Sequence, residues 1–78
     1  MSSPAIRIHA NDNVVIARRQ LLGGTVIPEE GVTVAGLVPP GHKIATRAIA
    51  QGQPVRRYDQ VIGTATQDIA PGQHVHTH

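Results

Sequence analysis

Histidine occupies every second position in the last five residues of the chain. If this segment is extended, successive side chains alternate between two faces, so His74, His76 and His78 share one face. The Val and Thr between them are β-branched and favour a strand over a helix. Neutral imidazole is a common ligand of transition metals, so the spacing predicts a row of side chains that binds a metal or an anion.

Strand geometry limits which of these imidazoles can share one ion. Neighbours at i and i+2 are about 6.6 Å apart along a strand, and His74 and His78 are about 13 Å apart. Metal–nitrogen bonds of about 2.0–2.1 Å let an adjacent pair hold one ion, but not the outer two. A further ligand must come from elsewhere in the chain, from a substrate or from a partner. Two other interpretations are open: solvated polar residues on a frayed terminus, or a purification tag, which the alternation with Val and Thr disfavours.

The composition narrows the kinds of core that this chain can form. The 78 residues make one small domain with no Cys, Trp or Phe, and Tyr58 is the only aromatic residue. Disulfides and Cys-based zinc sites are therefore excluded, and the core must be built from Val, Ile, Leu and Ala. Such a core fits a compact β-fold, or a subunit that gains stability by docking on another protein. We expect Tyr58 to be a partly buried packing residue.

Charge and hydropathy exclude two classes of partner. Seven basic and five acidic residues give a net charge of +2, and the only adjacent basic pairs are Arg18-Arg19 and Arg56-Arg57. Nucleic-acid binders show denser basic faces and more stacking aromatics, so we predict no nucleic acid, although steering of small anions stays open. No stretch approaches the roughly 20 apolar residues needed to cross a bilayer, and no secretory signal opens the chain. We therefore predict no membrane association and a cytoplasmic location.

The order of apolar runs and turn residues predicts short strands. Turns are expected at 10–13, 28–31 and 39–41, where Asn, Asp, Gly and Pro cluster. Residues 18–22 could form one short helical turn ended by the glycines that follow. The predicted strands are 5–9, 14–17, 25–27, 32–35, 42–47, 55–58, 61–63 and the terminal His segment.

An internal repeat connects these strands. Each of three copies has an Ala, an aliphatic residue four positions later, a Gly three after that, and an aliphatic residue two or three further on; the copies begin at Ala17, Ala45 and Ala65. This pattern describes a strand, an apolar turn anchored in the core, a Gly that permits positive φ, and a new strand. Strands that stop and restart at such turns predict a compact, sharply folded all-β module.

Five motifs follow one another along the chain in a recognisable order. They are Ile8-His9-Ala10-Asn11-Asp12-Asn13-Val14, Pro40-Gly41-His42-Lys43-Ile44-Ala45, Ala48-Ile49-Ala50-Gln51-Gly52, Ile62-Gly63-Thr64-Ala65-Thr66-Gln67-Asp68-Ile69 and the His-rich ending. With these motifs the sequence resembles, from about Ile6 to His78, the small N-terminal module of the altronate/galactarate dehydratase family, which also includes sulfolactate sulfo-lyases. The resemblance implies a β-clip fold of the SAF (antifreeze-like) type, with residues 1–5 as an N-terminal tail and 6–78 as one domain. Arg57-Tyr58-Asp59 departs from the family pattern, which usually has Lys before the Tyr and Gly after it.

The resemblance also implies an activity. Members of this family take part in β-elimination from sugar acids such as altronate or galactarate, with the small module either fused before a large catalytic domain or made separately. Because the chain stops at His78, we expect a separate small subunit of a lyase (hydro-lyase), inactive alone, that pairs with a large catalytic dehydratase subunit. A homo-oligomer is also compatible with the sequence. The alternatives are a non-catalytic interaction module of antifreeze-like fold, a sulfolactate sulfo-lyase-type small subunit, and a free-standing metal-binding protein.

Elimination of water removes the proton α to a carboxylate while the β-hydroxyl departs, and a divalent metal stabilises the negative charge that develops. With this chemistry, the resemblance implies catalytic roles for His42, Lys43 and His76. Metal binding is expected from His74, His76 and His78, with His42 as a further ligand. We expect the ion to be iron, manganese or zinc, shared with the large subunit.

The anionic sugar-acid substrate is expected to contact a second set of residues. Lys43 would pair with its carboxylate, and His9, Asp12 and Asn13 would complete the substrate-binding set. Asp12 could instead orient an imidazole or simply form the turn. None of the five carboxylates in the chain is a convincing general base. The base is therefore expected from the large subunit.

Overall fold

The computed structural model describes residues 3–75, which form short strands and no helix. This confirms the all-β prediction. The strands are β1 (Ala5–Ile6), β2 (Val14–Ala17), β3 (Val26–Ile27), β4 (Val32–Thr33), β5 (Lys43–Ala45), β6 (Pro54–Arg57) and β7 (Gln60–Thr64). Residues 3–75 contain no helix that could span a membrane.

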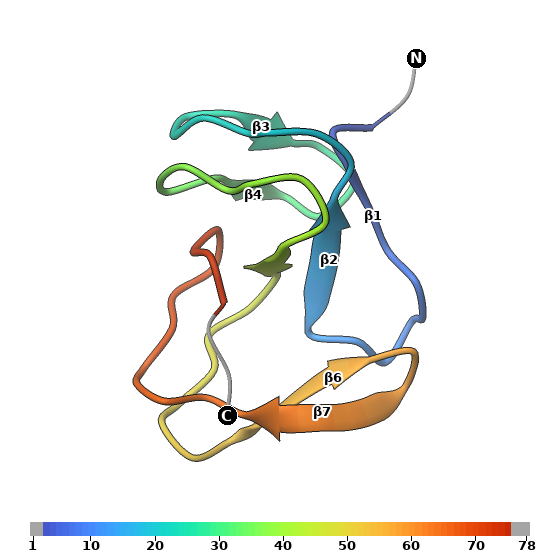
Figure 1. Ribbon diagram of the computed structural model, residues 1–78, viewed down its shortest axis with the longest axis vertical. Coiled ribbons are helices and arrows are strands. Elements are labelled where there is room, and N and C mark those ends of the chain that lie inside the picture. Colours follow the sequence, from blue (N-terminus) through green and yellow to red (C-terminus); the bar gives the residue numbers. More distant parts are fainter. Residues whose placement is uncertain (1–2, 76–78) are drawn as a thin grey trace.

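The strands pair in three small antiparallel sheets. β1, β2 and β5 form a three-stranded sheet in that order, while β3–β4 and β6–β7 are separate hairpins. The β3–β4 hairpin lies at one end of the molecule and the β6–β7 hairpin at the other, with β2 running between them (Figure 1). Isolated bridges join Leu21 to Val38, Ile44 to His74 and Ile49 to Ile69.

The central strands β2 and β5 separate two hydrophobic cores. In a strand, neighbouring side chains point to opposite faces. Val15 and Ile44, paired across β2 and β5, belong to one core, and the next pair, Val14 and Ala45, belongs to the other. All four are at most 1% exposed. The first core is completed by Ala5, Ala17, Leu21, Ile27, Val32, Val34 and Val38, and the second by Ile49, Val55, Ala65, Ile69 and Val75.

The predicted repeat is the framework of both cores, and the structure adds a fourth copy. The apolar positions of the three predicted copies are all buried except Val26, which alternates with the buried Ile27. The same spacing recurs at Val34, Val38, Gly41 and Ile44, with Val in place of the first Ala. The copies associate in pairs, through the bridge of Leu21 to Val38 and that of Ile49 to Ile69.

The repeat glycines make equivalent turns. Each lies at a positive φ between 80° and 94°, as the third residue of a type II turn requires. Each donates its backbone N–H to the first residue of the copy with which its own copy pairs. These bonds are Gly24 to Val34, Gly41 to Ala17, Gly52 to Ala65 and Gly72 to Ala45, at 2.7–2.9 Å.

Two sequence predictions are wrong. Residues 18–22 form no helical turn, because the backbone N–H and C=O of Leu21 both pair with Val38 at 2.9 Å. Tyr58 is 61% exposed instead of partly buried. With Asp59 it forms the turn between β6 and β7, both at φ near 60°, and the tip of this two-stranded hairpin leaves the Tyr58 side chain exposed.

Candidate functional site

The structure brings His42 and His74 into direct contact. His42 Nδ1 lies 2.9 Å from His74 Nε2, and the ring centroids are 4.9 Å apart with the planes tilted by 42°. One ring donates a proton to the other in such a contact, so the pair holds one proton between two nitrogens. His42 is exposed and His74 is half-buried, so a ligand can reach them.

Backbone pairing along β5 explains why these rings meet. His74 lies opposite Ile44, and His42 is two residues before Ile44, which makes the two histidines diagonal neighbours on one face. The segment with His74 is held on β5 by three bonds, which are Gly72 N–H to Ala45 C=O at 2.8 Å, Ala45 N–H to Gln73 C=O at 2.9 Å and Val75 N–H to Lys43 C=O at 2.9 Å.

The turn before His42 fixes the other ring. The His42 N–H donates to Pro39 C=O at 3.2 Å, which closes the predicted Pro-Pro-Gly turn, and the His42 C=O accepts from Ala17 N–H at 2.9 Å. Lys43 follows as the half-buried first residue of β5. His42 and His74 therefore both lie in backbone segments that are held in place by hydrogen bonds to neighbouring segments.

The distance between His42 Nδ1 and His74 Nε2 would suit two ligands of one metal ion only if the ion replaced the proton that the two nitrogens share. For bonds of about 2.0–2.1 Å, nitrogens 2.9 Å apart subtend about 90° at the ion, the angle between adjacent ligands of an octahedral site. Residues 3–75 contain no group of three His, Cys, Asp or Glu that could hold a metal. The other predicted ligands, His76 and His78, lie outside the described residues.

Asp12 is a buried carboxylate that holds the β6–β7 turn. It is 3% exposed and accepts the backbone N–H groups of His9, Tyr58 and Asp59 at 2.7–3.1 Å. Three amide donors on one carboxylate compensate for the loss of its hydration. Both oxygens are engaged within the protein, which accounts for its burial without a ligand.

Asn13 joins three segments of the chain. Its side-chain amide donates to Pro54 C=O at 3.0 Å and accepts from Arg56 N–H at 2.8 Å, which is the pattern of a neighbouring strand. Its own C=O accepts the Thr46 N–H at 3.0 Å. The residue is 6% exposed. It thereby sets the position of β6 relative to β2 and to the segment after β5.

His9 makes its contacts at the β6–β7 turn and not at the histidine pair. Its Nδ1 accepts the Asn11 N–H at 3.1 Å and lies 3.9 Å from the Asp59 carboxylate, which in turn accepts from the Asn11 side chain. His9 and Asp59 are both about 45% exposed. The predicted site residues within 3–75 thus fall into two groups, one around His42, Lys43 and His74, the other in the 9–13 loop.

Comparison with known proteins identifies the module. The family described as "Altronate/galactarate dehydratase SAF domain" matches residues 3–78. The chain belongs to this SAF domain family. The match covers nearly the whole sequence, and the family resemblance predicted from the motifs is thereby confirmed.

This SAF domain matches part of larger enzymes and most of an enzyme subunit. An altronate dehydratase of Escherichia coli (strain K12) is 45% identical over 75 residues, and that of Bacillus subtilis (strain 168) is 39% identical over 75. In both, the match covers 94% of this chain and 15% of the relative. The (2R)-sulfolactate sulfo-lyase subunit alpha of Chromohalobacter salexigens is 37% identical over 62 residues, which are 76% of this chain and 66% of that subunit.

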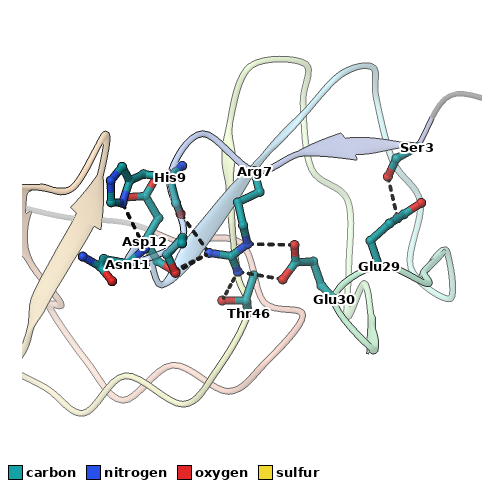
Figure 2. A network of polar contacts seen from close by, with 9 residues as sticks. Ser3, Arg7, His9, Asn11, Asp12, Glu29, Glu30 and Thr46 are labelled. Carbon is teal, nitrogen blue, oxygen red and sulfur yellow. Dashed lines mark hydrogen bonds and ion pairs between the residues drawn. The ribbon is translucent and has the colours of Figure 1, made fainter.

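One polar anchor of the SAF domain has no signal in the sequence. Arg7 forms a paired contact with Glu30, Nε to Oε2 at 2.9 Å and Nη2 to Oε1 at 2.6 Å, and also donates to Asp12 C=O at 2.7 Å (Figure 2). The hydrogen bonds to Glu30 raise the pKa of Arg7 above its ordinary value, against the effect of burial. The two residues are 23 positions apart, so only the fold reveals the pair.

Proposed function

We propose that this SAF domain acts as the small subunit of a hydro-lyase that eliminates water from a sugar acid such as altronate or galactarate. It contributes histidines to an active site that it forms with a large catalytic dehydratase subunit. The family and the altronate dehydratase relatives support the reaction class. The relatives that are named as subunits support a separate chain.

The contact between His42 and His74 carries this proposal. An imidazole pair with one shared proton can deliver that proton to the departing β-hydroxyl. Lys43, next to His42, supplies a positive charge for the substrate carboxylate. These roles need access for a ligand, and His42 is exposed while His74 is half-buried.

Metal binding is the alternative role of the same histidines. An ion bound by His42 and His74 would replace the proton that the two nitrogens share, with His76 and His78 as the further ligands that the sequence pattern predicts. The bound ion, iron, manganese or zinc, would stabilise the negative charge that develops on the substrate carboxylate. His9, with Asn13 and Asp12 behind it, remains the proposed contact for the distal end of the sugar acid.

An exposed apolar surface supports a large partner. Leu22, Val26 and Leu37, in the paired segment that runs from Leu21 to Val38, are each more than half exposed, at 57–62%. Exposed apolar side chains on one paired segment favour burial against another protein. We propose this segment as the docking surface for the large subunit, in a cytoplasmic complex.

The test measures dehydration of altronate and galactarate by the chain alone, by a large dehydratase subunit alone, and by the mixture. We expect turnover only in the mixture, inhibition by a chelator, and recovery with iron, manganese or zinc. His42→Ala and His74→Ala should each lower kcat by about 100-fold, the usual loss of an acid–base group. Arg18→Ala, an exposed change elsewhere, is the control and should leave kcat unchanged. Full activity of the His76→Ala/His78→Ala double variant would refute the metal proposal.

The main alternative is a non-catalytic interaction module. It predicts that His42→Ala changes neither binding to the large subunit nor turnover. Loss of binding with Leu22→Asp and Leu37→Asp, combined with full activity of all histidine variants, would favour this alternative. A sulfolactate sulfo-lyase subunit, as in the third relative, would instead release sulfite from (2R)-sulfolactate in the same mixing assay.

A further inference from the structure

A pocket of about 360 Å³ lies away from the histidine pair. His42 precedes β5 and Arg47 follows it, so the two residues lie at opposite ends of this strand. The pocket has the size of a site for a small metabolite. Its lining residues come from the segment after β5, from the start of β6 and from the residue before β2: Asn13, Arg47, Ala48, Ile49, Ala50, Gln53, Pro54 and Arg56.

The charges of this pocket are all positive. Two arginines line it and no Asp or Glu does. Within residues 3–75, the guanidinium groups of Arg47 and Arg56 make no ion pair or hydrogen bond, whereas that of Arg7 is paired with Glu30. Unpaired guanidinium groups at one pocket attract an anion.

The acidic residues of the described chain are committed elsewhere. Glu30 pairs with Arg7, Glu29 accepts the Ser3 hydroxyl, Asp12 accepts backbone amides, and Asp68 accepts the Gln51 N–H. Asp59 faces Asn11 and His9. The two pocket arginines therefore receive no carboxylate from within residues 3–75.

The backbone beneath the arginines is fixed. Asn13 accepts the Thr46 N–H next to Arg47, and its side chain brackets β6 through Pro54 and Arg56. One buried residue thus holds both arginine-bearing segments in place. A shift in the pairing of β6 with β7 falls between Val55 and Arg56, and such bulges redirect side chains at binding sites.

We propose that this pocket binds a small organic anion through a carboxylate or phosphate group held between Arg47 and Arg56. Two guanidinium forks match the oxygen pairs of either group. The Gln53 side-chain amide would bind a hydroxyl of the ligand, and the apolar lining residues Ile49, Ala48 and Pro54 would contact its carbon chain. The site is independent of the histidine pair and of the proposed elimination reaction.

The test is an NMR titration of the full chain with citrate in one arm and inorganic phosphate in the other. We expect saturable shifts at the amides of Asn13, Arg47, Gln53 and Arg56. The arm that saturates at lower concentration identifies the preferred group. Arg47→Ala/Arg56→Ala should weaken binding at least about tenfold, since each arginine contributes hydrogen bonds to a charged group. Arg47→Lys/Arg56→Lys keeps the charge but lacks the paired N–H donors of the planar guanidinium, so its loss of affinity should be intermediate.

The matched control is Arg18→Ala/Arg19→Ala, which removes the same charge from an exposed pair outside the pocket. It should bind citrate and phosphate like the unchanged chain, and so should His42→Ala/His74→Ala. Chemical shifts that fail to saturate would show general charge attraction and overturn the proposal. So would an equal loss of affinity in Arg47→Ala/Arg56→Ala and in Arg18→Ala/Arg19→Ala. An active complex with no such binding would refute this site and leave the proposed function intact.

Discussion

Gly72 offers a sharp test of how the histidine pair is positioned. It is the only buried one of the repeat glycines at residues 24, 41, 52 and 72, and an added Cβ would overlap the Thr33 carbonyl oxygen. Its own C=O accepts the Ala35 N–H at 2.9 Å. The turn that leads into His74 therefore packs directly on the backbone at the end of β4, with no room for a methyl group.

Gly52→Ala is a matched control for Gly72→Ala. Gly52 has φ +83° and Gly72 φ +90°, in equivalent turns, but nothing lies within 4 Å of a Cβ at Gly52. Alanine in the left-handed region costs about 1–2 kcal/mol in either variant, partly offset by the about 0.4–1 kcal/mol by which alanine restricts the unfolded chain. Only Gly72→Ala adds the cost of a forced backbone shift, about 1–3 kcal/mol by analogy with overpacked cores.

The assay is urea unfolding followed by circular dichroism, with thermal unfolding in parallel. We expect Gly72→Ala to lose about 1–3 kcal/mol more unfolding free energy than Gly52→Ala, which for a domain of this size separates the Tm values by at least about 5 °C. In folded Gly72→Ala, nitrogen NMR of the imidazoles should show that the His42–His74 hydrogen bond is lost. Equal destabilisation of the two variants, or an unchanged histidine contact in Gly72→Ala, would refute the reasoning.

Two further predictions concern carboxylates. Asp12→Ala leaves three backbone N–H groups without their acceptor and should lower the unfolding free energy by about 2–4 kcal/mol in urea. Asp68 is exposed and has one N–H partner, so Asp68→Ala should cost only about 0.5–1 kcal/mol. Equal losses in the two variants would contradict the role given to Asp12. The pKa of Glu29 is lowered from 4.5 by its own backbone N–H and then by the Ser3 hydroxyl. Because a lowered pKa means that folding favours the charged form, this contribution exists above pH 4.5 and is lost as pH falls through the folded-state pKa. Ser3→Ala should raise the Glu29 pKa part of the way to 4.5 in a carboxyl NMR titration, and an unchanged pKa would contradict the Ser3 contact.

Much of the fold could be predicted because it depends on local signals. The spacing of Ala, aliphatic residue and Gly located three of the four core turns, and each predicted Gly has the positive φ that its turn needs. The fourth copy was missed because Val34 replaces the small residue that defined the pattern. Residues 18–22 look helical by propensity, but pairing of Leu21 with Val38 overrides a preference of a few tenths of a kcal/mol per residue.

The candidate site was predictable only where it depends on sequence spacing. Alternation placed His74 on a strand and the Pro-Pro-Gly turn placed His42 at a corner, and the register of Ile44 with His74 brings the two together. The turn at Tyr58 and Asp59 lacks the usual Asn-Gly signal and is held from a distance by Asp12. Arg47 and Arg56 line one pocket through tertiary contacts, among them those of Asn13, which no local pattern encodes.

The placement of Val14 and Val15 in different cores has a consequence for folding accuracy. A slide of β2 by one residue puts one valine in the place of the other, but it also moves Asn13 into the place of Val14, or Arg18 into that of Ala17, so apolar burial disfavours both slides. The amide of Asn13 adds to this discrimination, because it finds its partners on β6 only in the native alignment. Replacing Asn13 with Ala should therefore weaken the alignment of β2, visible as broadened or doubled NMR resonances along this strand.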